Sequence, residues 1–376
     1  MLSSPLTPQK SSKTQNDITG TKKQMETKIF DISPEVIDEN AIAQAADIIK
    51  RGGLVAFPTE TVYGLGASAT DAQAAAKIYA AKGRPSDNPL IIHIATPEDA
   101  EKYAYTDKLY YALARAFMPG PLTVIMKKKD IVPDGVTGGL DSVAVRCPSH
   151  PIAAELIREC GIAVAAPSAN LSGSPSPTSA EHVIADLNGV IDGIICGGEC
   201  EIGLESTIVK IDGDTLTLLR PGAITADALR CVCDNVEIAP SVTEALAENE
   251  RPLSPGMKYR HYAPSVPLVL LEGEREFVMT FLHNAQNAER CAILCYHEEL
   301  DELRCERLID IGSEDDLITQ AQRLFAALRH ADELDCDIIY AHLPPKDGIG
   351  LALYNRLIRA AAHTVLHVTR ENIKHH

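Results

Sequence analysis

A polar stretch with four prolines, residues 231–266, divides the chain into two parts that each carry apolar segments of strand and helix length. The stretch has no sustained hydrophobic periodicity, which is typical of a linker. A chain of 376 residues fits two domains of roughly 100–200 residues each. We therefore predict a disordered tail over 1–28, a larger domain over 29–230, a linker over 231–266 and a smaller domain over 267–376.

The larger part alternates short apolar runs with helical patterns. Strands are predicted at 54–57, 90–94, 122–126, 142–146, 161–166, 194–196, 207–211 and 216–219. Helices are predicted at 34–50, 71–81, 107–117, 150–159 and 179–187. This alternation predicts a mixed α/β domain, in which ligands bind where strand ends meet loops.

The smaller part has a regular β-α rhythm. Strands are predicted at 268–271, 292–296 and 337–342, and helices at 274–285, 314–330 and 350–362. Such a rhythm is typical of a small parallel, Rossmann-like sheet. Because this part contains no GxGxxG motif, nothing in its sequence predicts nucleotide binding there.

Charge and cysteine usage exclude several classes of protein. The net charge is −17 and neither half is basic, which argues against broad coating of nucleic acid. The longest apolar runs, such as 162–166 and 268–271, are far shorter than the roughly 20 residues of a membrane span. Ten cysteines without a CxxC pair predict buried, reduced thiols in a cytoplasmic protein. Whether the tail targets an organelle stays open.

Polar and basic residues follow several predicted elements of the larger part. Lys82 and Arg84 follow a helix in a turn rich in glycine and proline, and Arg146 ends a predicted strand. Each alone is more often a solvated surface residue, but similar residues at five chain segments together favour an anion or phosphate site. The sequence has no Walker-type loop, HExxH, EF-hand or GxSxG motif. The chemistry predicted is therefore positioning and charge stabilisation.

Three groups of residues in the larger part resemble the YrdC-type family. They are Pro58-Thr59-Glu60-Thr61-Val62-Tyr63-Gly64-Leu65-Gly66, Lys82-Gly83-Arg84-Pro85 with Asn88-Pro89-Leu90 and His93, and Ser168-Ala169-Asn170 with Ser172-Gly173. The segment Ser-Pro-Gly-Met-Lys-Tyr-Arg-His-Tyr-Ala-Pro at 254–264, followed by a small α/β domain, is similar to the two-domain form of the threonylcarbamoyl-AMP synthases. The resemblance covers about residues 35–370. It implies a YrdC-type mixed α/β domain with an open ligand-binding cleft, followed by the small Rossmann-like domain.

The resemblance implies an enzyme that makes L-threonylcarbamoyl-AMP from L-threonine, bicarbonate and ATP and releases pyrophosphate. A separate tRNA threonylcarbamoyl transferase complex would use the product to modify the adenosine next to the anticodon. A weak tRNA contact of this chain belongs to the same expectation. Mg²⁺ is expected with ATP, without an assigned protein ligand.

The resemblance also implies a role for each matching residue. The catalytic residues would be Lys82, Arg84, Ser168 and Asn170. The ATP-binding residues would be Arg84, Asn88, Ser142, Ser168, Ser176, Arg220 and Tyr262. The threonine-binding residues would be Thr61, His93, Arg146, Ala166 (by its backbone) and Ser206.

The linker segment 254–264 has an unusual composition for a spacer. It concentrates Lys258, Arg260, His261 and two tyrosines in an acidic chain, whereas passive linkers favour Gly, Ser or repeated Pro. We predict that it lies as a lid across the first domain, with Tyr262 on the nucleotide, and excludes water.

Two other functions stay open on the sequence alone. A YrdC-type domain could bind double-stranded or transfer RNA without catalysis, although the net charge of −17 disfavours broad contact. A carbamoyl-transferring maturation factor uses a related domain, but carries CxxC segments and an acylphosphatase-like region that this sequence lacks.

Overall fold

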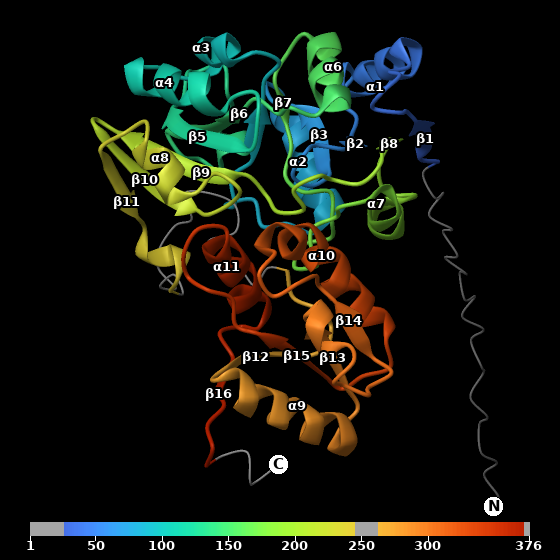
Figure 1. The fold of residues 1–376 in the computed structure, drawn as a ribbon. Helices are drawn as coiled ribbons and strands as arrows, with labels where there is room; N and C mark the ends of the chain where they lie inside the picture. Colours follow the sequence, from blue (N-terminus) through green and yellow to red (C-terminus); the bar gives the residue numbers. More distant parts are fainter. Residues whose placement is uncertain (1–25, 245–261, 372–376) are drawn as a thin grey trace, which may run out of the picture.

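The computed structural model describes residues 26–244 and 262–371. Most of the predicted tail and residues 245–261 of the predicted linker lie outside these ranges. The described chain forms two lobes, the larger blue to yellow and the smaller orange to red (Figure 1). Within the described ranges, no helix is both long and apolar enough to cross a membrane.

The larger domain is built on one mixed sheet. Its strands are β1 (Lys28–Asp31), β2 (Val55–Phe57), β3 (Gly64–Ser68), β4 (Ile91–His93), β5 (Leu122–Lys127), β6 (Ser142–Arg146), β7 (Val164–Ala165), β8 (Gly193–Cys196), β9 (Thr207–Asp212), β10 (Thr215–Arg220) and β11 (Asn235–Ile238). Their order across the sheet is β1-β8-β2-β3-β7-β4-β6-β5-β9-β10-β11. β4 and β6 are parallel, while β7 is antiparallel to β4. Loops that leave some of these strands therefore lie next to loops that enter others.

Helices pack on both faces of this sheet. Both faces carry apolar side chains, because successive residues of a strand point to opposite sides. The helices are α1 (Glu39–Lys50), α2 (Ala72–Lys82), α3 (Ala100–Tyr103), α4 (Lys108–Phe117), α5 (Asp134–Thr137), α6 (Pro151–Cys160), α7 (Ala180–Leu187) and α8 (Ala226–Arg230). Val55 and Phe57 of β2 pack in one apolar cluster with α1 and α6. Ala56 belongs to the other cluster, with α2, α4 and α7.

Two helix boundaries differ from the prediction for local reasons. The helix predicted over 34–50 begins after Asp38, whose carboxylate accepts hydrogen bonds from the backbone N–H groups of Asn40 and Ala41. The helix predicted over 71–81 includes Lys82 and ends at Gly83, which has a φ of 61°. Lys82, which the sequence analysis placed in the turn after the helix, is therefore the last residue of the helix, and its side chain is 3% exposed.

The sequence prediction missed strand β3. Its residues, Gly-Leu-Gly-Ala-Ser, include no β-branched or aromatic residue, so β propensity is weak. A Cβ on Gly66 would lie 2.8 Å from the Phe57 ring and 2.9 Å from Val164 Cγ1. Glycine thus lets β3 pass between β2 and β7, to both of which it pairs antiparallel.

The sheet continues beyond residue 230, where the sequence predicted a linker. β11 pairs in parallel with β10, and a 3₁₀ turn, η2 (Pro240–Val242), follows it. This edge strand pairs along one side with β10, and its side chains are mostly exposed. An edge strand of this kind contains few buried apolar residues. Its sequence pattern is therefore similar to that of a linker.

The smaller domain has a parallel sheet with helices on both faces. Its elements are β12 (Leu268–Glu272), α9 (Arg275–Ala288), β13 (Cys291–Cys295), η3 (His297–Glu299), β14 (Leu308–Asp310), α10 (Leu317–Glu333), β15 (Ile338–His342), α11 (Gly350–Ala360) and β16 (Val365–His367). The strand order is β14-β13-β15-β12-β16, and each neighbouring pair is parallel. The Rossmann-like prediction is confirmed, with two further short strands, β14 and β16.

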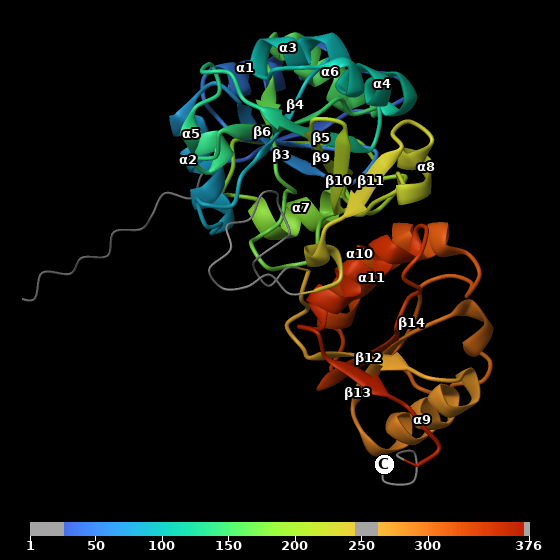
Figure 2. The same ribbon diagram turned by 90° about the vertical axis from the view of Figure 1, so that its left-hand side faces the viewer.

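The domains pack directly against each other through α10 and α11, while α9 lies on the far face of the small sheet (Figures 1 and 2). Val62 of the larger domain shares an apolar cluster with Phe325 of α10. Arg329 of α10 donates to Asp186 Oδ2 at 2.8 Å and to the Pro175 carbonyl at 2.7 Å. The interface therefore reaches loops that lie next to the strand ends of the larger sheet.

Candidate active site

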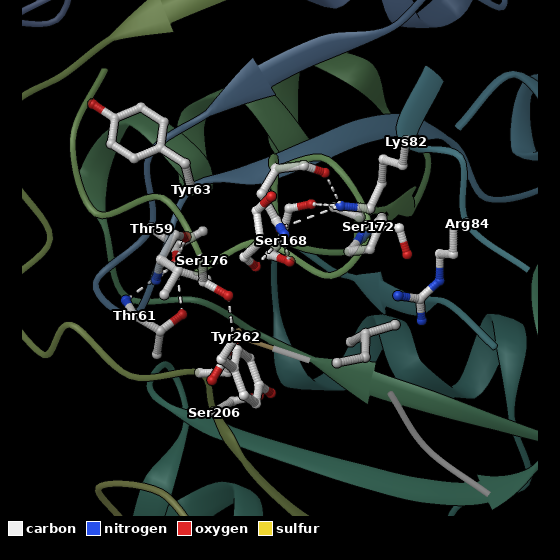
Figure 3. Close-up of a pocket in the computed structure, with 18 of the residues that line it drawn as sticks. Thr59, Thr61, Tyr63, Lys82, Arg84, Ser168, Ser172, Ser176, Ser206 and Tyr262 are labelled. Atoms are coloured by element: carbon white, nitrogen blue, oxygen red, sulfur yellow. Dashed lines mark hydrogen bonds between the residues drawn. The ribbon is translucent and has the colours of Figure 1, made fainter. Parts of the chain in front are cut away.

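A pocket opens where the ends of β4, β6, β7 and β10 meet the loop after β2. Its empty volume is about 690 Å³, open solvent at the mouth included. Lys82 and Arg84 lie on one side of it, Thr61 and Ser176 on the other, and Tyr262 below (Figure 3). The predicted site residues that line it are Thr61, Lys82, Arg84, His93, Arg146, Ala166, Ser168, Asn170, Ser176, Ser206, Arg220 and Tyr262.

The Lys82 side chain lies among three oxygen acceptors. Its Nζ donates to Ser168 O at 2.6 Å, Asn170 O at 2.5 Å and Asn170 Oδ1 at 3.3 Å. Burial, and then the charge of Arg84, lower the pKa of Lys82 well below its usual range. A neutral amine has only two N–H donors, so these three acceptors are satisfied together only by the ammonium form. The Ser168 hydroxyl also donates to Asn170 Oδ1, at 2.5 Å, which joins the three residues in one network.

Backbone carbonyls hold the Arg84 guanidinium. Its Nε donates to Asn88 O at 3.3 Å and its Nη2 to Pro89 O at 3.1 Å. Burial lowers the pKa of Arg84 to about 10, which still leaves it charged at neutral pH. Arg84 is therefore a fixed cation in the pocket wall, a suitable donor to phosphate oxygens.

A second basic part of the wall lies where β4 and β6 end side by side, at His93 and Arg146. Arg146 Nη2 lies 2.8 Å from Glu60 Oε1, and both side chains are almost fully buried. Burial by itself would raise the pKa of Glu60, but the charge of Arg146 lowers it. Burial, and then the charge of Arg146, lower the pKa of His93 to about 3. The wall thus combines one paired guanidinium with a neutral imidazole at neutral pH.

A buried carboxylate, Glu205, supports the hydroxyl side of the pocket. Ser176 Oγ donates to Glu205 Oε1 at 2.6 Å, and Arg356 Nε donates to Glu205 Oε2 at 2.8 Å. Burial by itself would raise the pKa of Glu205, but the charges of Arg356 and Arg220 lower it. Next to it, Arg220 Nη2 donates to Ser206 Oγ at 3.1 Å. Both serine hydroxyls therefore have orientations set by buried charges.

Tyr262 joins the pocket to the smaller domain. Its ring packs on Phe325 of α10 with centroids 5.1 Å apart, and Arg356 of α11 lies 5.7 Å from its centre. The lid predicted from the linker falls mostly on residues 254–261, which lie outside the described residues. Of that segment, the described structure includes Tyr262 as a buried part of the pocket wall.

Two predicted ATP-binding residues do not line the pocket. Asn88 lies behind Arg84 and contacts it through its backbone oxygen. Ser142 begins β6, at the opposite end of that strand from Arg146. At about 3.3 Å per residue, the two ends are about 13 Å apart. Contact of either side chain with ATP stays a prediction.

Three charged residues at or next to the pocket were not assigned a role from the sequence: Glu60, Glu205 and Arg356. Their signal is a charged residue inside an apolar pattern, most clearly Arg356, which lies on a buried face of α11 and is fully buried. Such a residue must have a partner. The sequence could not identify the partner, because Glu205 lies 151 positions away.

The pocket does not offer a ready set of metal ligands. Among the described residues, no group of three or more His, Cys, Asp or Glu side chains could hold a metal ion. The Glu205 carboxylate is already bonded to Ser176 and Arg356. The described residues of the pocket therefore do not fit a resident metal.

The fold and the pocket together define a class of protein. It is a two-domain α/β protein whose pocket places fixed cations beside a cluster of hydroxyls, an arrangement that suits a phosphate-bearing ligand and a small carboxylate together.

Comparison with known proteins agrees with this class. The family model described as "Telomere recombination" matches residues 47–222, and the model of the threonylcarbamoyl-AMP synthase C-terminal domain matches residues 224–362. The Bacillus subtilis threonylcarbamoyl-AMP synthase is 44% identical, over 91% of this chain and 100% of the relative. The Schizosaccharomyces pombe threonylcarbamoyl-AMP synthase is 34% identical, over 86% of this chain and 88% of the relative.

A solved structure is similar over both domains. The crystal structure of P. abyssi Sua5 complexed with L-threonine has a TM-score of 0.86 and 42% identity, over 91% of this chain and 100% of that one. The chain therefore belongs to the threonylcarbamoyl-AMP synthase family, in its two-domain form.

Proposed function

We propose that this protein is an enzyme that makes L-threonylcarbamoyl-AMP from L-threonine, bicarbonate and ATP, with release of pyrophosphate. The observation that carries the proposal is the convergence of Lys82, Arg84, Arg146 and Arg220 on one pocket in a chain of net charge −17. Buried cations without a ligand are costly, so their convergence favours an anionic substrate. Relatives that share both domains carry the name of this activity.

The nucleotide would lie along the side of the pocket that contains Lys82 and Arg84. Arg84 is charged and held by two carbonyls, so it can donate to phosphate without first losing conformational freedom. Ser168 and Asn170 would hold Lys82 in place as well as contact the phosphates. Ser176, Arg220 and Tyr262 would contact the rest of the nucleotide, and Asn88 would support Arg84. Ser142 lies furthest from this arrangement.

Threonine would lie at the wall formed by His93 and Arg146. The guanidinium of Arg146 pairs with Glu60 through Nη2, and a guanidinium has further donors for a substrate carboxylate. The neutral His93 can hydrogen bond without repelling the ammonium form of threonine. The Thr61 and Ser206 hydroxyls and the Ala166 backbone would meet its remaining polar groups. The solved relative with bound L-threonine supports threonine as the amino acid.

The reaction needs two bond-forming steps. The amine of threonine attacks the carbon of bicarbonate-derived carbon dioxide, which gives a carbamate while water is released from bicarbonate. A carbamate oxygen then attacks the α-phosphorus, and the bond to pyrophosphate breaks. Negative charge builds on the α-phosphate and on pyrophosphate, where Lys82 and Arg84 stabilise it. Mg²⁺ bound with ATP would neutralise the phosphates, and we assign it no protein ligand.

The remaining parts of the proposal concern the use of the product and the compartment in which the protein acts. The product is an activated carbamoyl group, so a tRNA threonylcarbamoyl transferase complex is the proposed consumer, with a weak tRNA contact by this chain. Ten free cysteine thiols support a reducing compartment such as the cytoplasm.

Product analysis of the purified protein with ATP, threonine and bicarbonate tests the reaction. We expect pyrophosphate and threonylcarbamoyl-AMP in equal amounts, and only when all three substrates are present. Pyrophosphate release that does not depend on threonine and bicarbonate contradicts the proposal. Binding of transfer RNA without any product would instead favour the RNA-binding alternative.

A further inference from the structure

One arginine of the smaller domain is buried against the wall of the pocket in the larger domain. Arg356 of α11 is 0% exposed. Its Nε donates to Glu205 Oε2 at 2.8 Å, its Nη2 to Glu205 O at 3.4 Å and its Nη1 to Asn355 Oδ1 at 2.9 Å. Within the described ranges it is not part of the pocket lining, and it contacts two residues that are, Glu205 and Tyr262.

The contacts of Glu205 determine the direction of one hydrogen bond in the pocket. An ionised carboxylate can only accept hydrogen bonds. Ser176 Oγ, 2.6 Å from Glu205 Oε1, must therefore donate its single proton to Glu205. The Ser176 oxygen then presents only lone pairs to the pocket, and it can accept a hydrogen bond from a ligand but cannot donate one.

We propose that Arg356 is a positioning residue of the active site: by holding Glu205 as a carboxylate, it makes Ser176 an obligatory acceptor for a donor group of the substrate. Resting on the proposed function, we assign that donor to the nucleotide, as a ribose hydroxyl or the adenine amino group. A phosphate oxygen carries no proton at neutral pH and does not suit this position. The smaller domain thereby takes part in substrate recognition.

The charges around Glu205 explain why Arg356 matters. The groups that face it are Arg356 from α11, Arg220 from β10, the Ser176 hydroxyl and the Tyr262 phenol, and Arg359 of α11 lies beside Tyr262. Burial favours the protonated form of Glu205, and Arg356 is the strongest opposing charge. Without Arg356, Glu205 takes up a proton at higher pH and can itself donate to Ser176. Ser176 is then free to turn its proton toward the pocket, where it meets another donor.

The test is the pH dependence of ATP affinity in Arg356→Met, measured by calorimetry and as the KM for ATP between about pH 6 and pH 9. We expect the affinity at the acid end to fall about tenfold or more and to recover as pH rises and Glu205 ionises. The wild-type protein should lack this step, and Arg356→Lys should largely restore the wild-type profile. A merely structural role would lower affinity by the same factor at every pH.

Arg290→Met is the matched control. Arg290 also belongs to the smaller domain, but its ion pairs with Asp335 and Asp337 are exposed, so its ATP affinity should follow the wild-type profile. A profile of Arg356→Met that is parallel to that of the wild type overturns the proposal, whatever its absolute affinity.

Glu205→Gln keeps the proposal testable if Arg356→Met does not fold. Its side chain cannot ionise, so we expect lower ATP affinity that does not recover with pH, and wild-type affinity overturns the proposal. Calorimetric binding also separates this inference from the proposed function. If the wild-type protein binds ATP but makes no product, the proposed reaction is wrong, while the pH profile of binding still decides the role of Arg356.

Discussion

The two domains are both α/β units, but they use buried charge in opposite ways. In the larger domain, Lys82, Arg84, Arg146 and Arg220 lie around one pocket at the strand ends. In the smaller domain, the fully buried Arg356 lies on a helix and reaches out of its own domain to Glu205. The first domain therefore forms a site with its strand ends, and the second contributes to that site through its helices.

The strand ends of the smaller domain also differ from those of the larger domain in their charged and polar groups. His342 at the end of β15 lies 3.0 Å from Glu299, and its ring stacks on Tyr296 with centroids 4.5 Å apart. Glu299 Oε2 accepts from the Tyr296 backbone N–H and pairs with His342, so this end carries one shared acceptor, whereas the larger domain brings four cations to one pocket. A Rossmann-like topology does not by itself define a function.

The largest expected effect tests whether the buried cations of the larger domain form the active site. Lys82→Ala and Arg84→Ala should each lower kcat/KM for ATP by about tenfold to a hundredfold, because a charge-assisted phosphate contact is worth roughly 1.5–3 kcal/mol. Lys82→Ala should also lower the melting temperature, since the carbonyls of Ser168 and Asn170 lose their donor. Pyrophosphate release at low and saturating ATP, with thermal unfolding, measures both effects.

Lys77→Ala is the control for this experiment. Lys77 lies on the same helix as Lys82 but is exposed, so turnover should stay near that of the wild type. Near-normal turnover in both pocket variants would remove Lys82 and Arg84 from the catalytic machinery.

The next effect distinguishes the two basic walls of the pocket. Arg146→Lys should raise the KM for threonine about tenfold, or about 1.4 kcal/mol, with little change in the KM for ATP. Lysine keeps the charge but cannot contact Glu60 and a carboxylate with one planar fork. Steady-state kinetics in each substrate measures the split. Arg158→Lys, an exposed change on α6, is the control, and a raised KM for ATP alone would show that Arg146 serves the other ligand.

A third effect concerns the stability of the pocket in acid. The pKa of His93 is about 3 in the folded protein and about 6.5 in an unfolded chain. Between these values the unfolded state binds more protons, so the free energy of unfolding falls as pH falls, by up to about 1.4 kcal/mol per pH unit. Urea unfolding between about pH 4 and pH 7 should show this slope.

The His93→Gln variant should lose that part of the slope. His330→Gln should keep it, because His330 is an exposed residue of α10. An unchanged slope in His93→Gln would mean that other groups cause the sensitivity to acid.

The smallest expected effect compares two arginines of the smaller domain, one on its outer surface and one at the interface with the larger domain. Arg290→Ala removes exposed ion pairs on the outer surface, and we expect no measurable change in melting temperature or in the KM for ATP. Arg329→Ala removes a mostly buried contact to Asp186 and Pro175 of the larger domain. It should lower the melting temperature by several degrees, which differential scanning calorimetry can measure. Equal melting temperatures would show that this interface contact adds nothing to stability.

Much of the fold could be predicted because it follows local patterns. The runs at 122–126 and 142–146 became β5 and β6, since alternating and apolar residues directly reflect strand burial. β3 and β11 were missed for a different reason. The first depends on glycines that fit between neighbouring strands, and the second is an exposed edge whose partner supplies the order.

The sequence by itself identified Lys82, Arg84, Ser168 and Asn170 as candidate site residues, because long motifs carry them, and all four line one pocket. Only the tertiary structure determined which hydrogen-bond and ion-pair partners hold the charged residues of the pocket in place. Lys82 is buried under backbone carbonyls that lie 86 and 88 positions away, and Glu205 meets Arg356 across 151 positions. Hydrophobic periodicity reports which face of an element is buried, but a buried charge gains its stability from one particular partner. That partner is set by strand order and domain packing, which no local pattern encodes.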